Sequence, residues 1–496
     1  MSDAMTSLLS ASTALEIAIL VPLIGAVLIA LAGRWPNLRE AVTLVTAVTL
    51  FGVVMRILWS LQREEIIEIT LIEMLPGLSL AFHTEPLSIL FAAIASLLWI
   101  VTSVYAIGYM RGNDEKHQTR FYAFFAVALS GAMGVAFSAN LLTLFVFYEV
   151  LTLSTYPLVA HKGDEAAKKG ARTYLGILLA TSIGLLLPAI IWTWSVAGTL
   201  DFTPGGILEG NLSDGLGAVL LLMFVLGVGK AAVMPVHRWL PAAMVAPTPV
   251  SALLHAVAVV KAGVFTISKV VIYIFGLDYL GHVPAEKFLV YLVGFTVIAA
   301  SVVALRQVNI KRMLAYSTIS QLSYIVLAAL VLAPLSEVGA AVHIVAHAFG
   351  KITLFFAAGA IYVASKKTEV TQLSGIGRRM PWTMTAFAIG GLSMVGVPPT
   401  AGFVSKWYMI AGAFQNDNYF VLAVLVIATA LNAGYFLPII FRAFFDTEDQ
   451  PPKKDHGEAP WPMVAALATT AALVLLFFVY NGPVVDLEYG ILEVPQ

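Results

Sequence analysis

The segment Gly227–Phe265, GVGKAAVMPVHRWLPAAMVAPTPVSALLHAVAVVKAGVF, decides how the rest of the chain is interpreted. It lies among long apolar segments, yet it carries Lys230, His255 and Lys261 at what should be membrane depth. It also carries four prolines between positions 235 and 249, where two spanning helices would meet. Ionisable side chains are costly in lipid, and proline interrupts a helix. Together, these features indicate a functional site in a membrane transporter.

The composition predicts an all-α polytopic membrane protein. Of the 496 residues, 59% are hydrophobic and only 11% are charged, whereas soluble domains carry about 25% charged residues. The net charge of −1 gives no support for a nucleic-acid partner. The absence of cysteine excludes disulfides, thiol chemistry and cysteine-ligated iron–sulfur clusters. We find no cofactor motif, so we expect neither a cofactor nor enzymatic catalysis by this chain.

We expect about fourteen spanning helices, each near the ~20 residues that a bilayer requires. The predicted spans are 13–31, 41–61, 87–109, 121–137, 140–160, 171–197, 216–236, 251–275, 288–304, 313–333, 338–364, 384–412, 419–441 and 461–480. The first span lacks the basic start of a cleaved signal, so we expect it to be retained. The acidic gap 62–86 alternates around IIEITLI and allows a short strand or hairpin, and 446–460 is polar and proline-rich, as in a loop.

The distribution of basic residues tests this placement, because cytoplasmic loops are enriched in Lys and Arg. One set of alternate loops holds 20 of the 28 Lys and Arg residues, and the opposite set holds two, Arg63 and Lys287. One missed helix would scramble this alternation. The count therefore predicts that both termini face the outer side of a cell membrane.

Two ionisable residues stand out in the first half. Glu149, in FVFYEVLTLSTYP, is a carboxylate near the predicted bilayer middle. It predicts a proton or cation site paired with a nearby Lys, although a structural ion pair would explain it too. Lys230 lies in mid-span, five residues before Pro235, which would deprive the Ala231 carbonyl of its helical donor. Transporters build ion sites at such breaks; the alternative is a kink with a snorkelling Lys.

Further titratable residues follow on two later helices. Lys261 and Lys269 are eight residues apart and share one helical stripe, although Lys269 could also reach the outer interface. His255 can exchange a proton near neutral pH, but a lone histidine is often only a core residue. His343, His347 and Lys351, in HIVAHAFGK, advance roughly 12 Å along one helix face, as a proton relay requires. No cysteine or nearby carboxylate completes a zinc site there, so we expect no metal.

The segment GLSMVGVPPTAGFVSKW repeats the combination of a proline break and a lysine. Pro398 and Pro399 would free the carbonyls of Met394 and Val395, and Lys406 follows the break. The seventh and twelfth helices are separated by five, so they cross the membrane in opposite directions. This predicts two inverted repeats of helices 4–8 and 9–13. The expected units are 1–120 (helices 1–3), 121–275, 288–445 and the last helix, 461–480.

The chain resembles the antiporter-type subunits shared by respiratory NADH–quinone oxidoreductase (complex I) and the multisubunit Mrp sodium/proton antiporters. The resemblance lies in FYEVLTLSTYPLV, GKAAVMPVHRWLPAAMVAPTPVSALLHAVAVVKAG, IKRMLAYSTISQLSY, HIVAHAFGK and GVPPTAGFVSKW, and covers roughly residues 85–445. It implies fourteen helices with two inverted repeats. It also implies a polar axis in the membrane, carried by Glu149, Lys230, Lys261, His343 or His347, Lys351 and Lys406.

Within the family the chain looks most like the D branch of the Mrp antiporters. It stops after the fourteenth helix, it carries Lys406 where one complex I protein has Glu, and GRWPNLREAVTLVTA and EAPWPMV are similar to that branch. It departs from many relatives at Ala242, where they have Asp, and at Asn309, where they have an acidic residue. Both departures concern an acidic cytoplasmic entry point and leave the central axis intact.

The resemblance implies a proton-translocating subunit of a multisubunit Na⁺ or K⁺/proton antiporter in the cell inner or plasma membrane. Its partners would be the other membrane subunits, the bilayer, protons and the cation. In this hypothesis Glu149 stabilises protonated Lys230, and opening that pair sends the proton along the axis. The alternative is a proton-pumping subunit of a redox complex, either NADH–quinone oxidoreductase or a membrane-bound hydrogenase. An inert helical scaffold is disfavoured by the buried charges.

Overall fold

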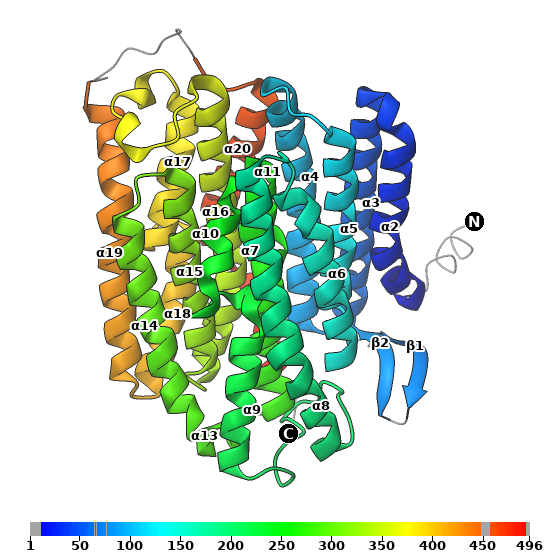
Figure 1. The fold of residues 1–496 in the computed structure, drawn as a ribbon. Coiled ribbons are helices and arrows are strands. Elements are labelled where there is room, and N and C mark those ends of the chain that lie inside the picture. Colours follow the sequence, from blue (N-terminus) through cyan, green and yellow to red (C-terminus); the bar gives the residue numbers. More distant parts are fainter. Residues whose placement is uncertain (1–10, 64, 66, 76, 448–456, 493–496) are drawn as a thin grey trace.

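The computed structural model describes residues 11–63, 65, 67–75, 77–447 and 457–492. They form a bundle of roughly aligned helices, with α2 and α3 at one side and α19 at the other (Figure 1). Among these residues, eleven helices are long and apolar enough to cross a membrane. The prediction of a helical, polytopic membrane protein is therefore confirmed, whereas the count of fourteen spans stays a prediction.

The first quarter of the chain forms four helices and one hairpin. They are α2 (Ala11–Leu31) with the short η1 (Ala32–Arg34), α3 (Pro36–Leu61), β1 (Glu68–Leu75), β2 (Leu78–His83), α4 (Pro86–Gly112) and α5 (Gln118–Ala136). The two strands pair antiparallel, with Glu68 opposite His83, so the hairpin predicted in the acidic gap is confirmed. Pro36 and Pro86 start their helices at positions where a missing N–H costs nothing.

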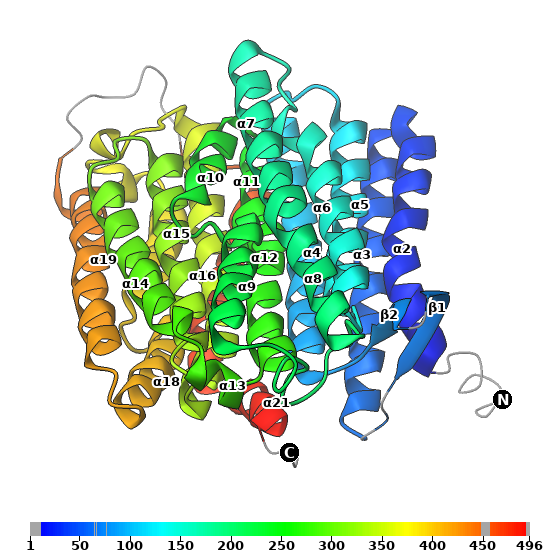
Figure 2. The same ribbon diagram turned by 60° about the horizontal axis from the view of Figure 1, so that its bottom comes forward.

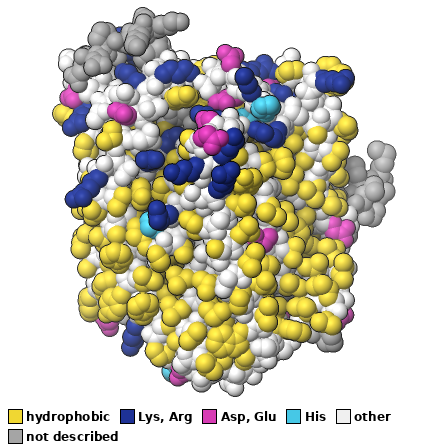
Figure 3. Space-filling model, in the orientation of Figure 1, with side chains coloured by type: hydrophobic (Ala, Val, Ile, Leu, Met, Phe, Trp, Pro, Cys, Tyr) yellow, Lys and Arg dark blue, Asp and Glu magenta, His cyan; other side chains and the backbone are white. Residues whose placement is uncertain are grey.

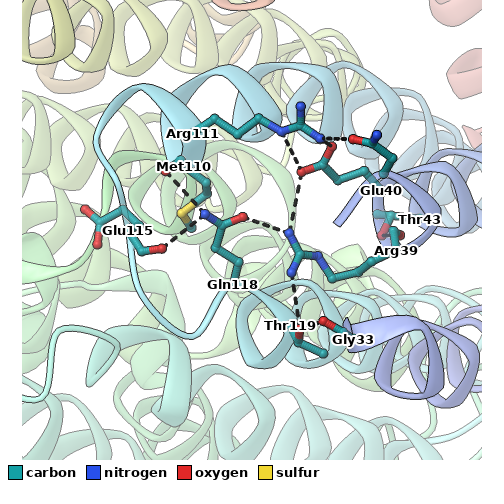
Figure 4. Close-up of polar contacts among 10 residues, drawn as sticks. Gly33, Arg39, Glu40, Thr43, Met110, Arg111, Glu115, Gln118 and Thr119 are labelled. Carbon is teal, nitrogen blue, oxygen red and sulfur yellow. Dashed lines mark hydrogen bonds and ion pairs between the residues drawn. The ribbon is translucent and has the colours of Figure 1, made fainter. Parts of the chain in front are cut away.

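A buried polar network joins α3, α4 and α5 (Figure 4). Arg111 on α4 donates to both carboxylate oxygens of Glu40 on α3, at 3.1 Å and 2.5 Å. Arg39 donates at 2.8 Å to Gln118 and at 3.2 Å to Thr119, both on α5. Since Arg39 and Glu40 are each 4% exposed, their charges need these partners. The network fixes the three helices relative to one another at one end of the bundle.

The middle of the chain contains several interrupted helices. Its elements are α6 (Leu141–Val159), α7 (Glu165–Thr181), η2 (Ser182–Leu186), α8 (Leu187–Ala197), α9 (Asp214–Gly227), η3 (Gly229–Ala231), η4 (Val236–Arg238), α10 (Trp239–Ala242), η5 (Ala243–Val245), α11 (Thr248–Ala252), η6 (Leu253–Val257), α12 (Val259–Lys269), η7 (Val270–Phe275) and α13 (Leu277–His282). Three of the interruptions, η2, η6 and η7, are π-helical turns, which often occur at functional sites.

The last part of the chain contains the longest helix. Its elements are α14 (Ala285–Leu305), α15 (Ile310–Ala329), α16 (Pro334–Ser365), η8 (Val370–Gln372), η9 (Ile376–Arg378), α17 (Pro381–Val395), α18 (Ala401–Gln415), α19 (Tyr419–Phe445), α20 (Trp461–Val479) and α21 (Gly482–Leu492). Figure 2 shows α21 at the lower end of the bundle, where its contacts are with α4 and α16. The short helices α13 and α21 were not predicted.

The helices differ in how much protein surrounds them. The apolar windows of Thr248–Phe275 and of α16 are completely buried inside the protein, whereas that of α3 is only 33% buried. These two central segments carry most of the predicted site residues. On the face shown in Figure 3, Lys and Arg side chains gather in the upper part, and apolar side chains cover most of the lower part.

Several predicted boundaries need correction. The span 216–236 is not one helix, because α9 ends at Gly227 and Lys230 lies in the 3-10 turn η3. The span 251–275 is present as the helical segment Thr248–Phe275, in which the π-turns η6 and η7 flank α12. The predicted break in 384–412 is confirmed, since α17 ends at Val395 and α18 begins at Ala401. Most of the predicted loop 446–460 lies outside the described residues.

Candidate functional site

The first break places Lys230 at the end of α9. The amide N–H of Val228 still bonds to Phe224, but Ala232 adopts a left-handed φ of 57°, which ends the helical path. The Gly229 carbonyl accepts the Ala232 amide at 3.0 Å and the indole of Trp239 at 2.9 Å, so the break is capped from inside the chain. Gly263 on α12 allows the close packing, since a Cβ there would lie 2.3 Å from the Ala231 nitrogen.

The ammonium of Lys230 is bound by α6 rather than by its own segment. Its Nζ donates at 2.5 Å to the Tyr148 carbonyl and at 2.6 Å to Thr152 Oγ1, and it lies 3.0 Å from the centre of the Tyr148 ring. Lys230 itself has no exposed surface. Carbonyl, hydroxyl and ring face together are the contacts that a buried cation requires.

Glu149 lies beside this site but does not contact it in the predicted way. Both carboxylate oxygens are buried and neither makes a hydrogen bond. Glu149 acts on Lys230 electrostatically, yet no ion pair within 4.0 Å joins them. The structure therefore shows no direct Glu149–Lys230 ion pair, since the ammonium bonds to the backbone carbonyl of Tyr148 instead, and the predicted coupling of the two residues stays a prediction.

A second cluster joins α12 to α16. Lys261 Nζ lies 2.8 Å from His347 Nδ1, and both residues are fully buried. The ring of His343 lies 6.0 Å from that of His347. His343 contacts Ser405 at 2.8 Å and Gln321 at 3.1 Å, so it connects α16 to α18 and α15. A neutral imidazole carries one donor and one acceptor, so this cluster can pass a proton from ring to ring through a bridging water.

Lys351 continues the same face of α16. Its Nζ donates at 2.6 Å to Ser317 Oγ on α15, and Tyr435 on α19 donates to the same oxygen at 2.9 Å. Tyr435 in turn contacts Asn432. The predicted stripe His343, His347 and Lys351 therefore lies on one buried helix and contacts polar groups on three neighbouring helices.

The second break binds its lysine within one broken helix. Lys406 Nζ, on α18, donates at 2.6 Å to the Met394 carbonyl and at 3.0 Å to the Val395 carbonyl at the end of α17. These are the two carbonyls that Pro398 and Pro399 were predicted to free. The Nζ also lies 4.9 Å from the centre of the Tyr324 ring. The freed carbonyls and the lysine that follows the break are thus brought together.

His255 is the least connected of the predicted residues. It lies in the π-turn η6, with neither ring nitrogen hydrogen-bonded, and its ring centre is 4.6 Å from that of Phe355. Lys351 and Lys311 are the charged side chains that interact electrostatically with the His255 ring. The structure thus places His255 against Phe355 of α16 without giving it a hydrogen-bonding partner.

The ion pair of Lys269 was not predicted from the sequence. Lys269 was expected either on the helical stripe or at the interface, but it is 1% exposed and forms a 2.9 Å ion pair with Glu85 at the start of α4. It also donates to the Ser138 carbonyl at 3.0 Å. Glu85 was visible only as one acid in an acidic gap. Nothing in the local sequence indicated that the gap returns to α12.

One departure from the family pattern, Asn309, has a clear structural role. Asn309 caps α15, because its side chain accepts a hydrogen bond from the Arg312 amide at 3.1 Å. His161, just after α6, has its pKa lowered to about 4, chiefly by burial and further by Arg120. At position 309, a neutral helix cap thus stands where many relatives have an acidic residue.

Among the described residues, no group of three or more His, Asp or Glu is placed to hold a metal ion.

Comparisons with known proteins agree with this arrangement. A model of the family described as NADH:quinone oxidoreductase/Mrp antiporter, transmembrane, matches residues 138–432. NADH-quinone oxidoreductase subunit N of Desulforudis audaxviator is 33% identical over 380 residues, which covers 76% of this chain and 75% of that protein. The D protein of the Na⁺/H⁺ antiporter of Alkalihalophilus pseudofirmus is 29% identical over 388 residues, with 77% of each covered.

The fold itself is also found in a solved membrane complex. A chain in the structure of the Mrp complex from Dietzia sp. superposes with a TM-score of 0.85 at 20% identity, and 97% of each chain is covered. Some sequence relatives are longer, since the matched region spans only 56% and 54% of two quinone oxidoreductase subunit 5 proteins. The matched region includes Glu149, Lys230 and Lys406. The chain therefore belongs to the NADH:quinone oxidoreductase/Mrp antiporter transmembrane family and is an antiporter-type membrane subunit.

Proposed function

We propose that this chain is the proton-translocating subunit of a multisubunit antiporter that exchanges Na⁺ or K⁺ for protons. The observation that carries the proposal is the buried contact between Lys261 and His347, on two helices that protein surrounds completely. A lysine bonded to a histidine with no counter-ion is costly as structure alone. It is readily explained as a step in proton transfer.

The proposed path begins at Glu149 and Lys230. When the ammonium lies on the Tyr148 carbonyl, the Glu149 carboxylate has no partner and can accept a proton or attract a cation. When the ammonium turns to Glu149, the pair is neutralised. The charge on one residue thus sets the position of the other. Electrostatic coupling of this kind needs no large helix movement.

The path continues through the two central helices. α12 packs against η3, which brings Lys261 close to the segment that holds Lys230. From Lys261 the proton passes to His347 and His343. Lys351 on α16 and His255 on η6 lie beside this route. Ser317 and Ser405 supply hydroxyl groups that can relay a proton. Lys406 at the second break exchanges with one bulk face.

The inverted repeats and the orientation belong to the same proposal. Two lysine-bearing breaks, five helices apart, support repeats at 121–275 and 288–445. The uneven distribution of Lys and Arg supports both termini on the outer side of the inner or plasma membrane. The Mrp relatives are named as parts of an antiporter and of a complex, which supports partners among other membrane subunits here.

Transport by the assembled complex tests the proposal. In inverted vesicles that carry the complex, Glu149→Gln and Lys230→Ala should each reduce cation-driven proton movement at least tenfold, followed with a pH-sensitive dye. Glu165→Gln is the matched control, because that carboxylate is on the surface and its side chain is 87% exposed. Antiport at the wild-type rate by both test variants would refute the proposed path.

The alternative is a proton-pumping subunit of a redox complex. The 33% identity to a quinone oxidoreductase subunit N favours it, and both functions use the same path. The partners separate the two. Purification of the intact complex followed by identification of its subunits by mass should yield small antiporter subunits under the proposal. Recovery of iron–sulfur or hydrogenase subunits would instead establish the alternative.

A further inference from the structure

A small cavity lies at the end of the bundle that carries α21. Ser268, Glu337 and Glu488 contribute its polar lining, and Leu, Ile, Val and Ala side chains complete it. The volume open to the centre of a water molecule is about 20 Å³, which is room for about one water molecule. α21 packs on α4 and α16 at this point (Figure 2). None of the residues in the proposed path contributes to this lining.

The two carboxyl groups in this cavity are buried, and three of their oxygens make no hydrogen bond. Glu337 is 7% exposed and neither of its carboxyl oxygens makes a hydrogen bond. Glu488 is 2% exposed and its Oε1 makes none. A buried carboxylate with no partner normally takes up a proton, because its charge is too costly in an apolar setting. Both side chains come from different helices and line the same cavity.

The neighbouring charges do not neutralise this pair. Lys269, at the end of α12, follows the lining residue Ser268 in the chain, and it is already bound to Glu85 at 2.9 Å. Glu85, Glu488 and Glu337 all act electrostatically on Tyr273 of η7. His83 on β2 has its pKa lowered chiefly by burial, with Glu85 opposing and Lys269 adding to the shift. Burial, and then Glu85, raise the pKa of Glu488 to about 8.

We infer that Glu337 and Glu488 form a proton-binding site that exchanges protons with the solution on the α21 side of the membrane. Each binding step adds one proton from water to a carboxylate oxygen, with no redox change. Glu337 starts α16, the helix of His343, His347 and Lys351, and Lys269 shares α12 with Lys261. The role of the site as the outer exchange point of transport rests on the proposed function; proton binding itself does not.

Infrared difference spectroscopy of the purified complex tests the binding. The carbonyl stretch of a protonated carboxyl group should be present at pH 7 and disappear as pH rises through about 8. Variant-minus-wild-type spectra isolate the site from Glu149. Each of Glu337→Gln and Glu488→Gln should remove about half of the signal, and the double variant should remove all of it. Glu165→Gln, on the surface, should leave the signal unchanged.

Three results would overturn the site. They are a double variant that retains the whole signal, a signal lost near the ordinary glutamate pKa of ~4.3, and a signal abolished by Na⁺ at constant pH, which would assign the cavity to a metal cation. Glutamine keeps the size of the side chain, so the folded state should survive. A thermal unfolding scan of each variant separates loss of the site from loss of the fold.

Sidedness and transport complete the test. In sealed vesicles, a pH jump on the α21 side should change the carboxyl signal before a jump on the opposite side does. Transport should fall several-fold in Glu337→Gln and Glu488→Gln. If the carboxyl signal behaves as expected while Glu149→Gln transports normally, the proton site stands and the proposed path fails. If Glu149→Gln abolishes transport while the double variant keeps the carboxyl signal, the path stands and this site is wrong.

Discussion

The two lysine-bearing breaks solve the same physical problem in different ways. At the first break, Lys230 lies in the interruption itself and donates to a carbonyl and a hydroxyl on a different helix, α6. At the second, Lys406 lies in the following half-helix and donates back to two carbonyls of its own broken helix. The first ammonium depends on a neighbour that also carries Glu149. The second depends on the break alone, so the first is better suited to sense a charge.

The glycines that allow close packing should give the largest effect. A Cβ at Gly402 would lie 1.8 Å from the Ser393 carbonyl oxygen of α17, and one at Gly263 would lie 2.3 Å from the Ala231 nitrogen of η3. Both contacts are with backbone, which cannot move aside like a flexible side chain. We expect Gly402→Ala and Gly263→Ala each to lower the free energy of unfolding by about 3 kcal/mol, the upper range for overpacking.

The matched control for both variants is Gly176→Ala. It lies in α7, and a Cβ there would meet no atom within 4 Å. This change should be neutral or stabilise the protein by roughly 0.5–1 kcal/mol, as alanine favours helix. Thermal unfolding in detergent measures all three. Equal unfolding temperatures for Gly263→Ala, Gly402→Ala and the control would show that the close packing of the breaks is not required.

Replacing each lysine with methionine should separate the two breaks. Lys406→Met leaves the Val395 carbonyl without the donor seen here and Met394 with only weak contacts at 3.4–3.5 Å. An unsatisfied buried carbonyl costs about 1–3 kcal/mol. In Lys230→Met, the Tyr148 carbonyl still accepts from the Thr152 hydroxyl at 3.0 Å. We therefore expect Lys406→Met to lower the unfolding temperature more than Lys230→Met does.

This ordering is informative because both variants should stop proton transfer. Stability and transport therefore report different properties of the same residue. If Lys230→Met proved the less stable of the two, the ammonium on α6 would be the principal support of the first break. The proposed difference between an acceptor on a neighbouring helix, at the first break, and acceptors on the broken helix itself, at the second, would then be lost.

Thr152→Val should give the smallest effect and act on the first break alone. It removes one of the two oxygen acceptors of Lys230 and keeps the shape of the side chain. Loss of about 1 kcal/mol from this hydrogen bond corresponds to roughly a fivefold change in transport rate. Thr266→Val is the control, since that hydroxyl donates to the Ala262 carbonyl of its own helix. A Thr152→Val rate equal to that of the control would exclude the hydroxyl from the ammonium site.

Local chemistry explains what the sequence predicted well. Pro398 and Pro399 cannot donate, so the carbonyls they free follow from the order of residues, and Lys406 is indeed bound there. The spacing of His343, His347 and Lys351 likewise fixes one helix face before any packing is known. The long apolar spans and the antiparallel hairpin are local patterns too.

Contacts between distant segments explain what it missed. The helix α9 ends at Gly227, before Pro235, which is the more obvious break in the sequence. The turn that follows α9 packs closely against Gly263 of α12, and this contact is not visible in the local sequence. No local signal predicts the π-turn that holds His255. The Glu85–Lys269 ion pair joins residues far apart in the chain. Lys230 was paired with the nearest carboxylate, whereas the structure gave it a carbonyl that any residue at position 148 would provide.

The complete burial of α16 has a consequence for the lipid. Its 32 residues span about 48 Å at 1.5 Å per residue, well beyond a hydrocarbon core of about 30 Å. Because protein surrounds its apolar window on every side, hydrophobic mismatch does not act on that window directly. Bilayer thickness acts on the peripheral helices instead, such as α3 and Glu165–Ala197, of which the apolar windows are only 33% buried. The helix that carries the histidines is thereby insulated from changes in membrane composition.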